Sequence, residues 1–506
     1  MGSISCAGDS LPPEGAKQSV DKEFMSHRYL KRINKCRSLF VTIGLACAAW
    51  LGGSGVAAAQ PTLEVILHFF GYTPNDGVEP QGGLMFGPDN ALYGTTPTTA
   101  SGGAGTVFKI GRDGTGYQII HNFTNSPDGA SAQTALRLGA DGLIYGTTYA
   151  GGTNNVGVMF RMSLNGGFYQ IVHQFTTNAD EPQQPLTPLF QAPDGTFYGT
   201  GSAGGTNGMG TIFKINPDGS DLQVLHSFGA TADGSSPNRA GLILANDGLL
   251  YGETPSGGTG NLGTIFRLAT NGGSYQVVHS FTNAPDGGSP VGMTLAQNGS
   301  LYIATAEGGS KGLGAIVKKN TDGNGWQVLH SFTNNPDGGI PLSGPMQAWD
   351  GAIYGMTYSG GYTVQGTIYR LQPDGSAYTN IYTFTNYAAP PYHLDGFHPQ
   401  SVLVQGTSVD NSGVLYGTTL DSSTNLVGVG GSVFGLVISP GLTITPINGQ
   451  NVVFWPGYAL NFELQTTTNL LAGPWIPATN GTSMAGLMFT NGTFPPTSFF
   501  RLIWPQ

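Results

Sequence analysis

The strongest constraint on this fold is a stretch of about fifty residues that recurs along most of the chain. Its clearest copy is Gly241–Pro290, which reads GLILANDGLLYGETPSGGTGNLGTIFRLATNGGSYQVVHSFTNAPDGGSP. Seven copies with a period near fifty predict a β-propeller or a solenoid. Aligned on the aromatic residue of an LYG-like signature, the copies are spaced by 51 to 62 residues and centre on Tyr93, Tyr145, Tyr198, Tyr251, Tyr302, Tyr354 and Tyr416.

Each copy contains four short apolar stretches separated by turn sequences. In the clearest copy the stretches read GLILA, LLYGET, GTIFRLA and SYQVVHSF, and the connections contain NDG, a glycine-rich loop and TNGG. Gly and Asn adopt positive φ at little cost, which suits tight hairpins between antiparallel strands. Four antiparallel strands per copy make one propeller blade.

The two ends of the repeat region complement each other. Thr62–Phe70 matches the fourth strand of a copy but has no first three strands before it, whereas the last copy stops after its third strand, Gly431–Ile438. Pairing these segments would close a ring and leave no open sheet edge. An open solenoid would instead need distinct caps at both ends. We therefore predict an all-β, seven-bladed β-propeller over residues 60–438, with four-stranded blades and the N-terminal strand closing the last blade.

After the repeats, residues 439–506 contain strand-like stretches, NVVFW, NFELQT and FFRLIW, between Gly, Pro and Asn turns. This pattern predicts a small C-terminal β-sandwich. The segment ends on strand-like sequence, so we expect no C-terminal membrane anchor.

Residues 1–59 differ from the rest of the chain. A basic run at His27–Arg37 precedes an apolar stretch at Ser38–Gly53, and an A-x-A sequence follows at Ala57–Ala59. This order predicts a leader with a secretory signal peptide, with Met25 as an alternative start. A retained membrane anchor is the competing interpretation, although the apolar run is shorter than the ~20 residues that a spanning helix needs.

The cysteines and the charge exclude several classes of protein. Cys6, Cys36 and Cys47 all lie in the leader, so the mature chain would have no disulfide framework, thiolate zinc site or cysteine nucleophile. Cys47 also leaves a lipoprotein signal as an alternative. Removing residues 1–59 leaves 12 basic and 25 acidic residues, a formal charge of about −13. We therefore expect a secreted or cell-surface protein (extracellular or periplasmic), no nucleic-acid partner and no integral membrane span after cleavage.

The repeats resemble the bacterial GloVer tandem repeat (Gloeobacter and Verrucomicrobia type), which occurs in secreted "choice-of-anchor" proteins. The match rests on LYGTT and GTVFKI within Leu92–Ile110, LIYGTTYAGG at Leu143–Gly152, TIFKINPDGS at Thr211–Ser220 and HSFTNAPDGG at His279–Gly288. The tail, with FELQTTTNL and FFRL, looks like a C-terminal sandwich of secreted proteins from the same bacteria. The resemblance implies export and surface display, and it carries no established activity.

An aspartate recurs once per copy in the connection from the fourth strand to the next blade. In a propeller this connection lies on the face where the axial channel opens, so these carboxylates are candidates for a ring at the channel mouth that binds a ligand or Ca²⁺. The alternative is an Asx turn, in which each aspartate bonds its own backbone before glycine. The residues are Asp76, Asp128, Asp180, Asp233, Asp286, Asp337 and Asp395.

A histidine recurs in the fourth strand of six copies, and the remaining copy has Tyr382. The fourth strand is outermost, about 14 Å from the innermost at ~4.7 Å per strand, so these side chains are too far apart to converge on one metal ion. Alternation favours hydrogen-bonded histidines packed between blades. The residues are His68, His121, His173, His226, His279 and His330.

An insertion at Asn386–Pro399 lengthens the connection before the last blade and adds His393, Asp395 and His398 as further candidates for ligand binding. The mature chain has no HExxH, GxSxG or P-loop motif, and the GxGxxG that begins at Gly258 precedes a strand rather than a helix. We therefore expect a monomeric, non-enzymatic propeller that binds or displays, with a glycan or surface polymer as the ligand that fits best, no identified catalytic residue and no firm cofactor. The alternative is a lyase or glycosidase with its site on the channel face.

Overall fold

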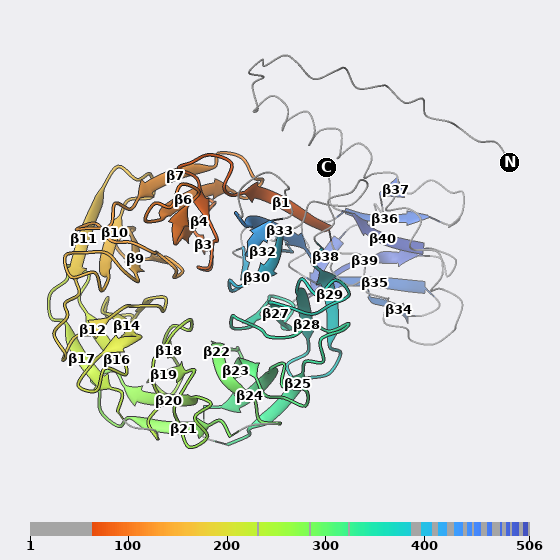
Figure 1. The fold of residues 1–506 in the computed structure, drawn as a ribbon. Coiled ribbons are helices and arrows are strands. Elements are labelled where there is room, and N and C mark those ends of the chain that lie inside the picture. The colour runs from red at the N-terminus through yellow and green to blue at the C-terminus, as the bar shows by residue number, and fades with distance from the viewer. Residues whose placement is uncertain are drawn as a thin grey trace, which may run out of the picture.

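The computed structural model describes residues 63–229, 232–282, 285–321, 324–385, 396–406, 413–422 and 430–438, and the backbone of the strands between 443 and 503. The regular secondary structure in this part of the chain consists of β-strands. Seven antiparallel sheets follow one another around a central opening, and the chain passes through them in order (Figure 1). The predicted seven-bladed propeller with four-stranded blades is confirmed.

In the first six blades the strands are added in chain order from the channel outward (Figure 1). Blade 1 contains β3 (Met85–Phe86), β4 (Ala91–Thr96), β6 (Thr106–Gly111) and β7 (Gln118–Asn122). Blade 2 contains β8 (Arg137–Leu138), β9 (Ile144–Thr148), β10 (Val158–Met162) and β11 (Tyr169–Gln174). Blade 3 contains β13 (Phe190–Gln191), β14 (Phe197–Gly201), β16 (Thr211–Ile215) and β17 (Gln223–Ser227).

The next three blades repeat this arrangement. Blade 4 contains β18 (Ile243–Leu244), β19 (Leu249–Thr254), β20 (Thr264–Ala269) and β21 (Gln276–Ser280). Blade 5 contains β22 (Gly288–Leu295), β23 (Ser300–Glu307), β24 (Ala315–Asn320) and β25 (Gln327–Ser331). Blade 6 contains β26 (Met346–Gln347), β27 (Ile353–Thr357), β28 (Thr367–Leu371) and β29 (Thr379–Thr383).

Blade 7 is assembled from both ends of the repeat region. It contains β31 (Val404–Gln405), β32 (Val414–Ser422), β33 (Ser432–Val437) and, as its outermost strand, β1 (Leu63–Phe69). β1 pairs antiparallel with β33 along its length and has a bulge between Ile66 and His68. The third and fourth strands of the other six blades have a bulge at the equivalent place. The N-terminal strand is therefore the fourth strand of the last blade, as the sequence predicts.

Short strands extend the inner part of three blades. β2 (Gly77–Val78) pairs with β5 (Thr98–Thr99) in blade 1, and β12 (Pro182–Gln183) pairs with β15 (Ala203–Gly204) in blade 3. In blade 7, β30 (Gly396–Pro399) pairs with β32.

The glycine of the LYG signature packs against an aromatic ring on the third strand. A Cβ atom on Gly199 of blade 3 would lie 2.7 Å from Cζ of Phe213, closer than side chains tolerate. In blade 5 this pair is replaced by Ile303 and Val317, which lie opposite each other and are fully buried. The larger residue on one strand is matched by the smaller one on its neighbour, as a close-packed core requires.

The C-terminal strands form two antiparallel sheets, with the orders β34-β35-β39-β38 and β37-β36-β40. Three of them coincide with the predicted stretches NVVFW, NFELQT and FFRLIW. The leader and the predicted signal peptide lie outside the described residues, as do His393 and Asp395. The bounds are β34 (Thr443–Ile447), β35 (Gln450–Pro456), β36 (Glu463–Thr467), β37 (Ile476–Pro477), β38 (Thr482–Ala485), β39 (Met488–Phe494) and β40 (Phe499–Ile503).

Ring closure predicts a large effect at Phe70, which follows β1. Phe70 is 2% exposed, and its ring centroid lies 5.1 Å from that of Phe108 in blade 1. Phe70→Ala should lower the free energy of unfolding by about 3–5 kcal/mol. Val65→Ala, in the same strand but 38% exposed, should change it by less than about 0.5 kcal/mol. Chemical denaturation checks both values.

Deleting residues 60–70 should also bare the edge of β33 and cause oligomers to form through it. A truncated protein that stays monomeric and keeps its stability would contradict ring closure.

Candidate functional site

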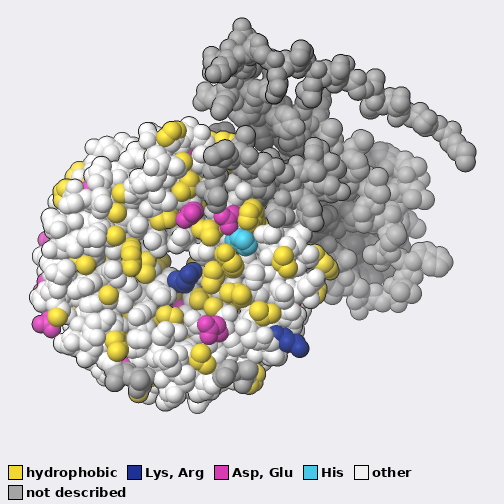
Figure 2. All heavy atoms as spheres, viewed as in Figure 1, with side chains coloured by type: hydrophobic (Ala, Val, Ile, Leu, Met, Phe, Trp, Pro, Cys, Tyr) yellow, Lys and Arg dark blue, Asp and Glu magenta, His cyan; other side chains and the backbone are white. Residues whose placement is uncertain are grey.

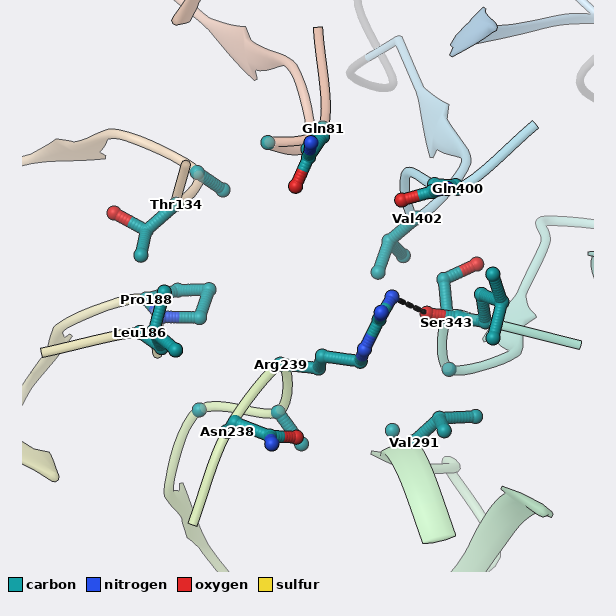
Figure 3. Close-up of a pocket in the computed structure, with 18 of the residues that line it drawn as sticks. Gln81, Thr134, Leu186, Pro188, Asn238, Arg239, Val291, Ser343, Gln400 and Val402 are labelled. Carbon is teal, nitrogen blue, oxygen red and sulfur yellow. Dashed lines mark hydrogen bonds between the residues drawn. The ribbon is translucent and has the colours of Figure 1, made fainter. Parts of the chain in front are cut away.

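The centre of the ring is a channel lined by the same segment of every blade. Each segment lies at the start of the innermost strand or just before it, and together they surround a cavity of about 220 Å³ (Figure 3). Because all seven blades contribute, this cavity depends on the closed ring.

A backbone hydrogen bond between neighbouring blades directs each segment into the channel. In all seven blades one residue has a left-handed φ of 50° to 57°, and its N–H donates to a carbonyl oxygen of the preceding blade at 2.7–3.0 Å. L-residues disfavour this conformation, so the bond and the surrounding packing must hold it. The seven residues are Glu79, Ser131, Gln184, Ser236, Ser289, Ile340 and His398.

The backbone of the lining is nearly sevenfold symmetric, but the side chains are not. The residue two positions after each left-handed residue lines the channel. Blades 7, 1 and 2, which are adjacent, place glutamines there: Gln400, Gln81 and Gln133. Blades 3, 5 and 6 place aliphatic residues there, and blade 4 has an asparagine: Leu186, Val291, Leu342 and Asn238.

Blade 4 has one residue more in this segment than blade 1, and Arg239 lies within the enlarged segment. Pro237 and Leu242 are five positions apart, whereas the equivalent proline and leucine of blade 1 are four apart. Arg239 has a φ of 68°, and its side chain crosses the channel to donate from Nη1 to the carbonyl oxygen of Leu342 in blade 6 at 3.2 Å (Figure 3). Burial lowers the pKa of Arg239, but a guanidinium stays protonated in proteins.

Arg239 is the one ionisable side chain among the described residues that line the cavity. Figure 2 shows a basic side chain at the central opening, with acidic and histidine side chains on the surrounding face. The channel therefore presents an isolated positive charge.

Behind the channel wall, blade 4 buries an acidic side chain. In blades 2 and 3 two threonines hydrogen-bond through their Oγ1 atoms, and in blade 3 the pair is Thr187 and Thr200 at 2.9 Å. The equivalent residues of blade 4 are Ala240 and Glu253. Glu253 is 2% exposed, and neither carboxyl oxygen has a hydrogen-bond partner among the described residues. Burial raises the pKa of Glu253 well above its usual range, which favours the neutral acid.

His398, one of the predicted site residues, lies on the channel face as the left-handed residue of blade 7. Its Nδ1 is 2.8 Å from Oδ2 of Asp421, and its ring stacks on Tyr358 of blade 6 with centroids 4.4 Å apart. The side chains of His398 and Asp421 are 24% and 20% exposed. This pair is therefore partly accessible to solvent.

Five of the aspartates predicted to ring the channel mouth lie beside histidines of the outermost strands instead, and none of the described ones lines the cavity. In four blades the carboxylate lies 3.0–3.2 Å from Nε2 of the histidine seven positions earlier, and His68 and Asp76 lie 3.6 Å apart. The same carboxylates accept backbone N–H groups from residues four or five positions earlier, rather than two positions later as in the Asx-turn alternative. The four closer pairs are His121–Asp128, His226–Asp233, His279–Asp286 and His330–Asp337.

Each of these five histidines also stacks on an aromatic residue of the next blade. The ring centroids are 3.5–3.9 Å apart and the planes differ by 3° to 14°. In the pairs with Tyr169 and Tyr275, the tyrosine hydroxyl donates to the backbone carbonyl of the aspartate at 2.8 Å. We call this His–Asp–aromatic contact the outer junction. In four blades it confirms the prediction of hydrogen-bonded histidines packed between blades, whereas His68 is stacked but its Nε2 has no hydrogen-bond partner among the described residues. The stacked pairs are His68–Tyr117, His121–Tyr169, His226–Tyr275, His279–Trp326 and His330–Tyr378.

Two of the seven contacts between blades differ. His173 of blade 2 meets blade 3, which has Leu222 where five other blades have an aromatic residue. Nε2 of His173 is buried without a hydrogen-bond partner in the described structure, and Asp180 is exposed. Burial lowers the pKa of His173. Blade 6 has Tyr382 at the histidine position, and its aspartate is Asp395.

The described residues bring together no three His, Cys, Asp or Glu side chains that could hold a metal ion. The Ca²⁺ hypothesis needed carboxylates gathered at the channel mouth. The carboxylates that it needed contact histidines and backbone instead.

Sequence reasoning missed Arg239, Glu253 and Asp421 because it searched for residue types that recur in every copy. Arg239 had a detectable signal, which is the lengthened spacing between Pro237 and Leu242. Glu253 had another, because it replaces a threonine of the LYGTT signature. The partnership of Asp421 with His398 depends on side-chain directions that the sequence does not display.

The closed ring of repeats defines the chain as a repeat protein of the seven-bladed β-propeller class. Two matches to the family described as the Gloeobacter/Verrucomicrobia repeat, at residues 56–246 and 238–445, span most of the chain, and the protein belongs to this family. The resemblance seen in the LYG-containing copies is thereby confirmed. No curated protein matches the chain.

Several solved structures are similar at 10% to 13% identity. The extracellular domain of a protein assigned as a one component system from B. thetaiotaomicron has a TM-score of 0.47 and 11% identity, covering 86% of this chain and 55% of that one. The extracellular domain of a protein assigned as a hybrid two component system from the same organism has a TM-score of 0.46 and 13% identity, covering 86% of this chain and 54% of that one. An oligogalacturonate lyase from Vibrio parahaemolyticus has a TM-score of 0.45 and 10% identity, covering 74% of this chain and 97% of that one.

Within the described residues, which do not include the leader, no helix is long and apolar enough to cross a membrane.

The outer junction predicts an acid-dependent effect at Asp128. Burial alone would raise the pKa of Asp128, but hydrogen bonds from His121 and the backbone outweigh it and lower the pKa. A lowered pKa stabilises the fold above the unfolded pKa of about 4, and this stability is lost as the pH falls through the folded value. Asp128→Asn should cost about 1–2 kcal/mol at pH 7 and less in acid. Asp180→Asn, the matched control, should stay within about 0.5 kcal/mol. Denaturation curves from pH 3 to 7 compare them, and equal losses would contradict the junction.

Glu253 predicts the opposite pH dependence. Because burial raises its pKa, its stability contribution is fully present below the unfolded value of about 4.3 and is lost as the pH rises toward the folded value. Restoring the threonine pair with Ala240→Thr/Glu253→Thr should raise the free energy of unfolding at pH 7 by about 1–3 kcal/mol. Glu253→Gln keeps the shape but does not ionise, so it should remove the pH dependence alone. A wild-type decline with pH that persists in Glu253→Gln would rule out this origin.

Proposed function

We propose that this protein is an extracellular, non-enzymatic propeller that binds a ligand at its channel face. The observation that carries the proposal is the contrast within the channel lining, where seven equivalent backbone segments hold different side chains. The outer junction, which has a structural role, instead repeats nearly the same residues in five blades. Varied side chains on a rigid scaffold are the usual arrangement of a binding site.

The chemistry of the lining favours a polyhydroxylated ligand such as a glycan. The amides of Gln400, Gln81 and Gln133 donate and accept hydrogen bonds, as hydroxyl groups require. Leu186 and Leu342 offer apolar surface for C–H groups. The cavity of about 220 Å³ corresponds to about seven water molecules, so it admits one end of a ligand whose remainder lies across the face.

Export and display belong to the same proposal. The basic run, the apolar stretch and the A-x-A sequence of residues 1–59 support a cleaved signal peptide. We propose that the two C-terminal sheets pack face to face as a small sandwich, and that the propeller acts as a monomer at or beyond the cell surface. The strand content of residues 443–503 supports a sandwich.

A glycan array with the exported protein tests the binding function. The double variant Gln81→Ala/Gln400→Ala should lose at least about tenfold in affinity for the glycans that wild type binds, because several hydrogen bonds are removed. The control Gln118→Ala/Gln327→Ala changes two exposed glutamines on outermost strands and should bind as wild type does. If both double variants bind equally well, the channel is not the site.

One observation favours a second function, a lyase or glycosidase. His398 is held by Asp421 at 2.8 Å on the channel face, and a carboxylate-oriented imidazole is a common general base. A screen of polysaccharide substrates should then find an activity that His398→Ala lowers by at least about 100-fold and His173→Ala leaves intact. A wild-type protein inactive on all substrates would remove this alternative.

A further inference from the structure

We infer that the ligand of the channel carries a single oxyanion, a carboxylate in particular, that binds the guanidinium of Arg239. The inference rests on the proposed function, because it specifies the chemistry of the ligand at the same site. The expected ligand is a neutral, polyhydroxylated molecule with one acidic end group.

The guanidinium of Arg239 has donors to spare. It carries five N–H groups, and the structure shows one hydrogen bond, from Nη1 to the carbonyl oxygen of Leu342. No ion pair of Arg239 occurs among the described residues. Glu253 of the same blade has its carboxyl group buried and does not line the cavity. The remaining donors lie in the channel, where a planar carboxylate can accept two parallel hydrogen bonds.

The lining forms without an arginine in the other six blades, although in blade 4 the backbone N–H of Arg239 also donates to the carbonyl oxygen of Leu186 in blade 3 at 3.1 Å. Blade 1 builds the same lining segment without the extra residue, and its backbone makes the same bond to the preceding blade. Arg239 instead adds a second left-handed residue to blade 4, after Ser236. Residues held in such conformations cost free energy and cluster at ligand-binding and active sites. The extra residue is therefore best explained by what its side chain does in the channel.

The charge of the whole chain limits the number of anionic groups. Without residues 1–59 the formal net charge is about −13, so a polyanion would be repelled by the protein surface. One carboxylate inside a cavity of about 220 Å³ can contact the guanidinium of Arg239 and the amides of Gln81 and Gln400 (Figure 3). This combination selects a ligand with one acidic end.

Small probes that differ only in charge test the inference on the full exported chain. D-Glucuronate should bind at least about tenfold more tightly than its methyl ester, because the ester keeps the hydroxyl groups but loses the charge. Arg239→Gln should abolish this difference, and Arg239→Lys should restore part of it because it keeps the charge without the planar fork. Lys311→Gln makes the same change of charge at an exposed loop of blade 5 and should leave the difference intact. Titration calorimetry, with inorganic sulfate as a further probe, measures each affinity.

Every outcome decides between the two proposals. Equal affinity for the acid and the ester, or unchanged binding of the acid in Arg239→Gln, would overturn the oxyanion inference and leave glycan binding standing. Binding of sulfate that depends on Arg239, with no sugar bound, would support the oxyanion site and reject the glycan. No binding of any probe at tens of millimolar would overturn both.

Discussion

The propeller depends on the contact between each blade and the next. A single repeat cannot bury its hydrophobic faces alone, so each blade must pack against its neighbours. Here the outer junction joins the rims, with a histidine stacked on the aromatic ring of the following blade and held by an aspartate. Such ring pairs contribute about 0.5–1.5 kcal/mol each beyond the area they bury. Nearer the axis, the tyrosine of the LYG signature also reaches across, as Tyr93 does to the carbonyl oxygen of Leu164.

The sequence predicted whatever recurs with the repeat. The LYG aromatics gave the number of blades, and the orphan segment Thr62–Phe70 gave the closing strand. The prediction from the sequence misplaced the aspartates because the connection that carries them is long. Asp128 and the channel residue Gln133 are five positions apart, up to ~17 Å of extended chain. The aspartate therefore stays at the rim while the rest of the connection reaches the axis. The position of Arg239 in the channel depends on one extra residue and on the direction of its side chain, and the periodicity of the repeats predicts neither.

The rim, the core and the axis of each blade differ in how strongly one side chain constrains its neighbours. At the rim, a change in one partner leaves a visible defect, as where Leu222 faces His173 and its Nε2 is left buried without a partner. In the core, Ile303 and Val317 changed together and the packing is intact. At the axis, a side chain that points into an open channel has no partner to match. Variation there is free of the packing constraints that hold the other two layers, so the side chains of the lining can be adapted to a ligand without loss of the fold.

The composite last blade gives the ring a fixed order of assembly. β1 leaves the ribosome first, yet its partner β33 follows more than 360 positions later. Until then the apolar side of β1 has no sheet to join, and the first blade lacks one of its two neighbours. Closing so long a loop costs only slightly more chain entropy than closing a short one, since the cost grows with the logarithm of length. The time before β1 can pair is therefore set by the synthesis and export of the chain rather than by the free energy of loop closure. Until β33 is available, the incomplete chain carries β1 as an unpaired strand near its N-terminus.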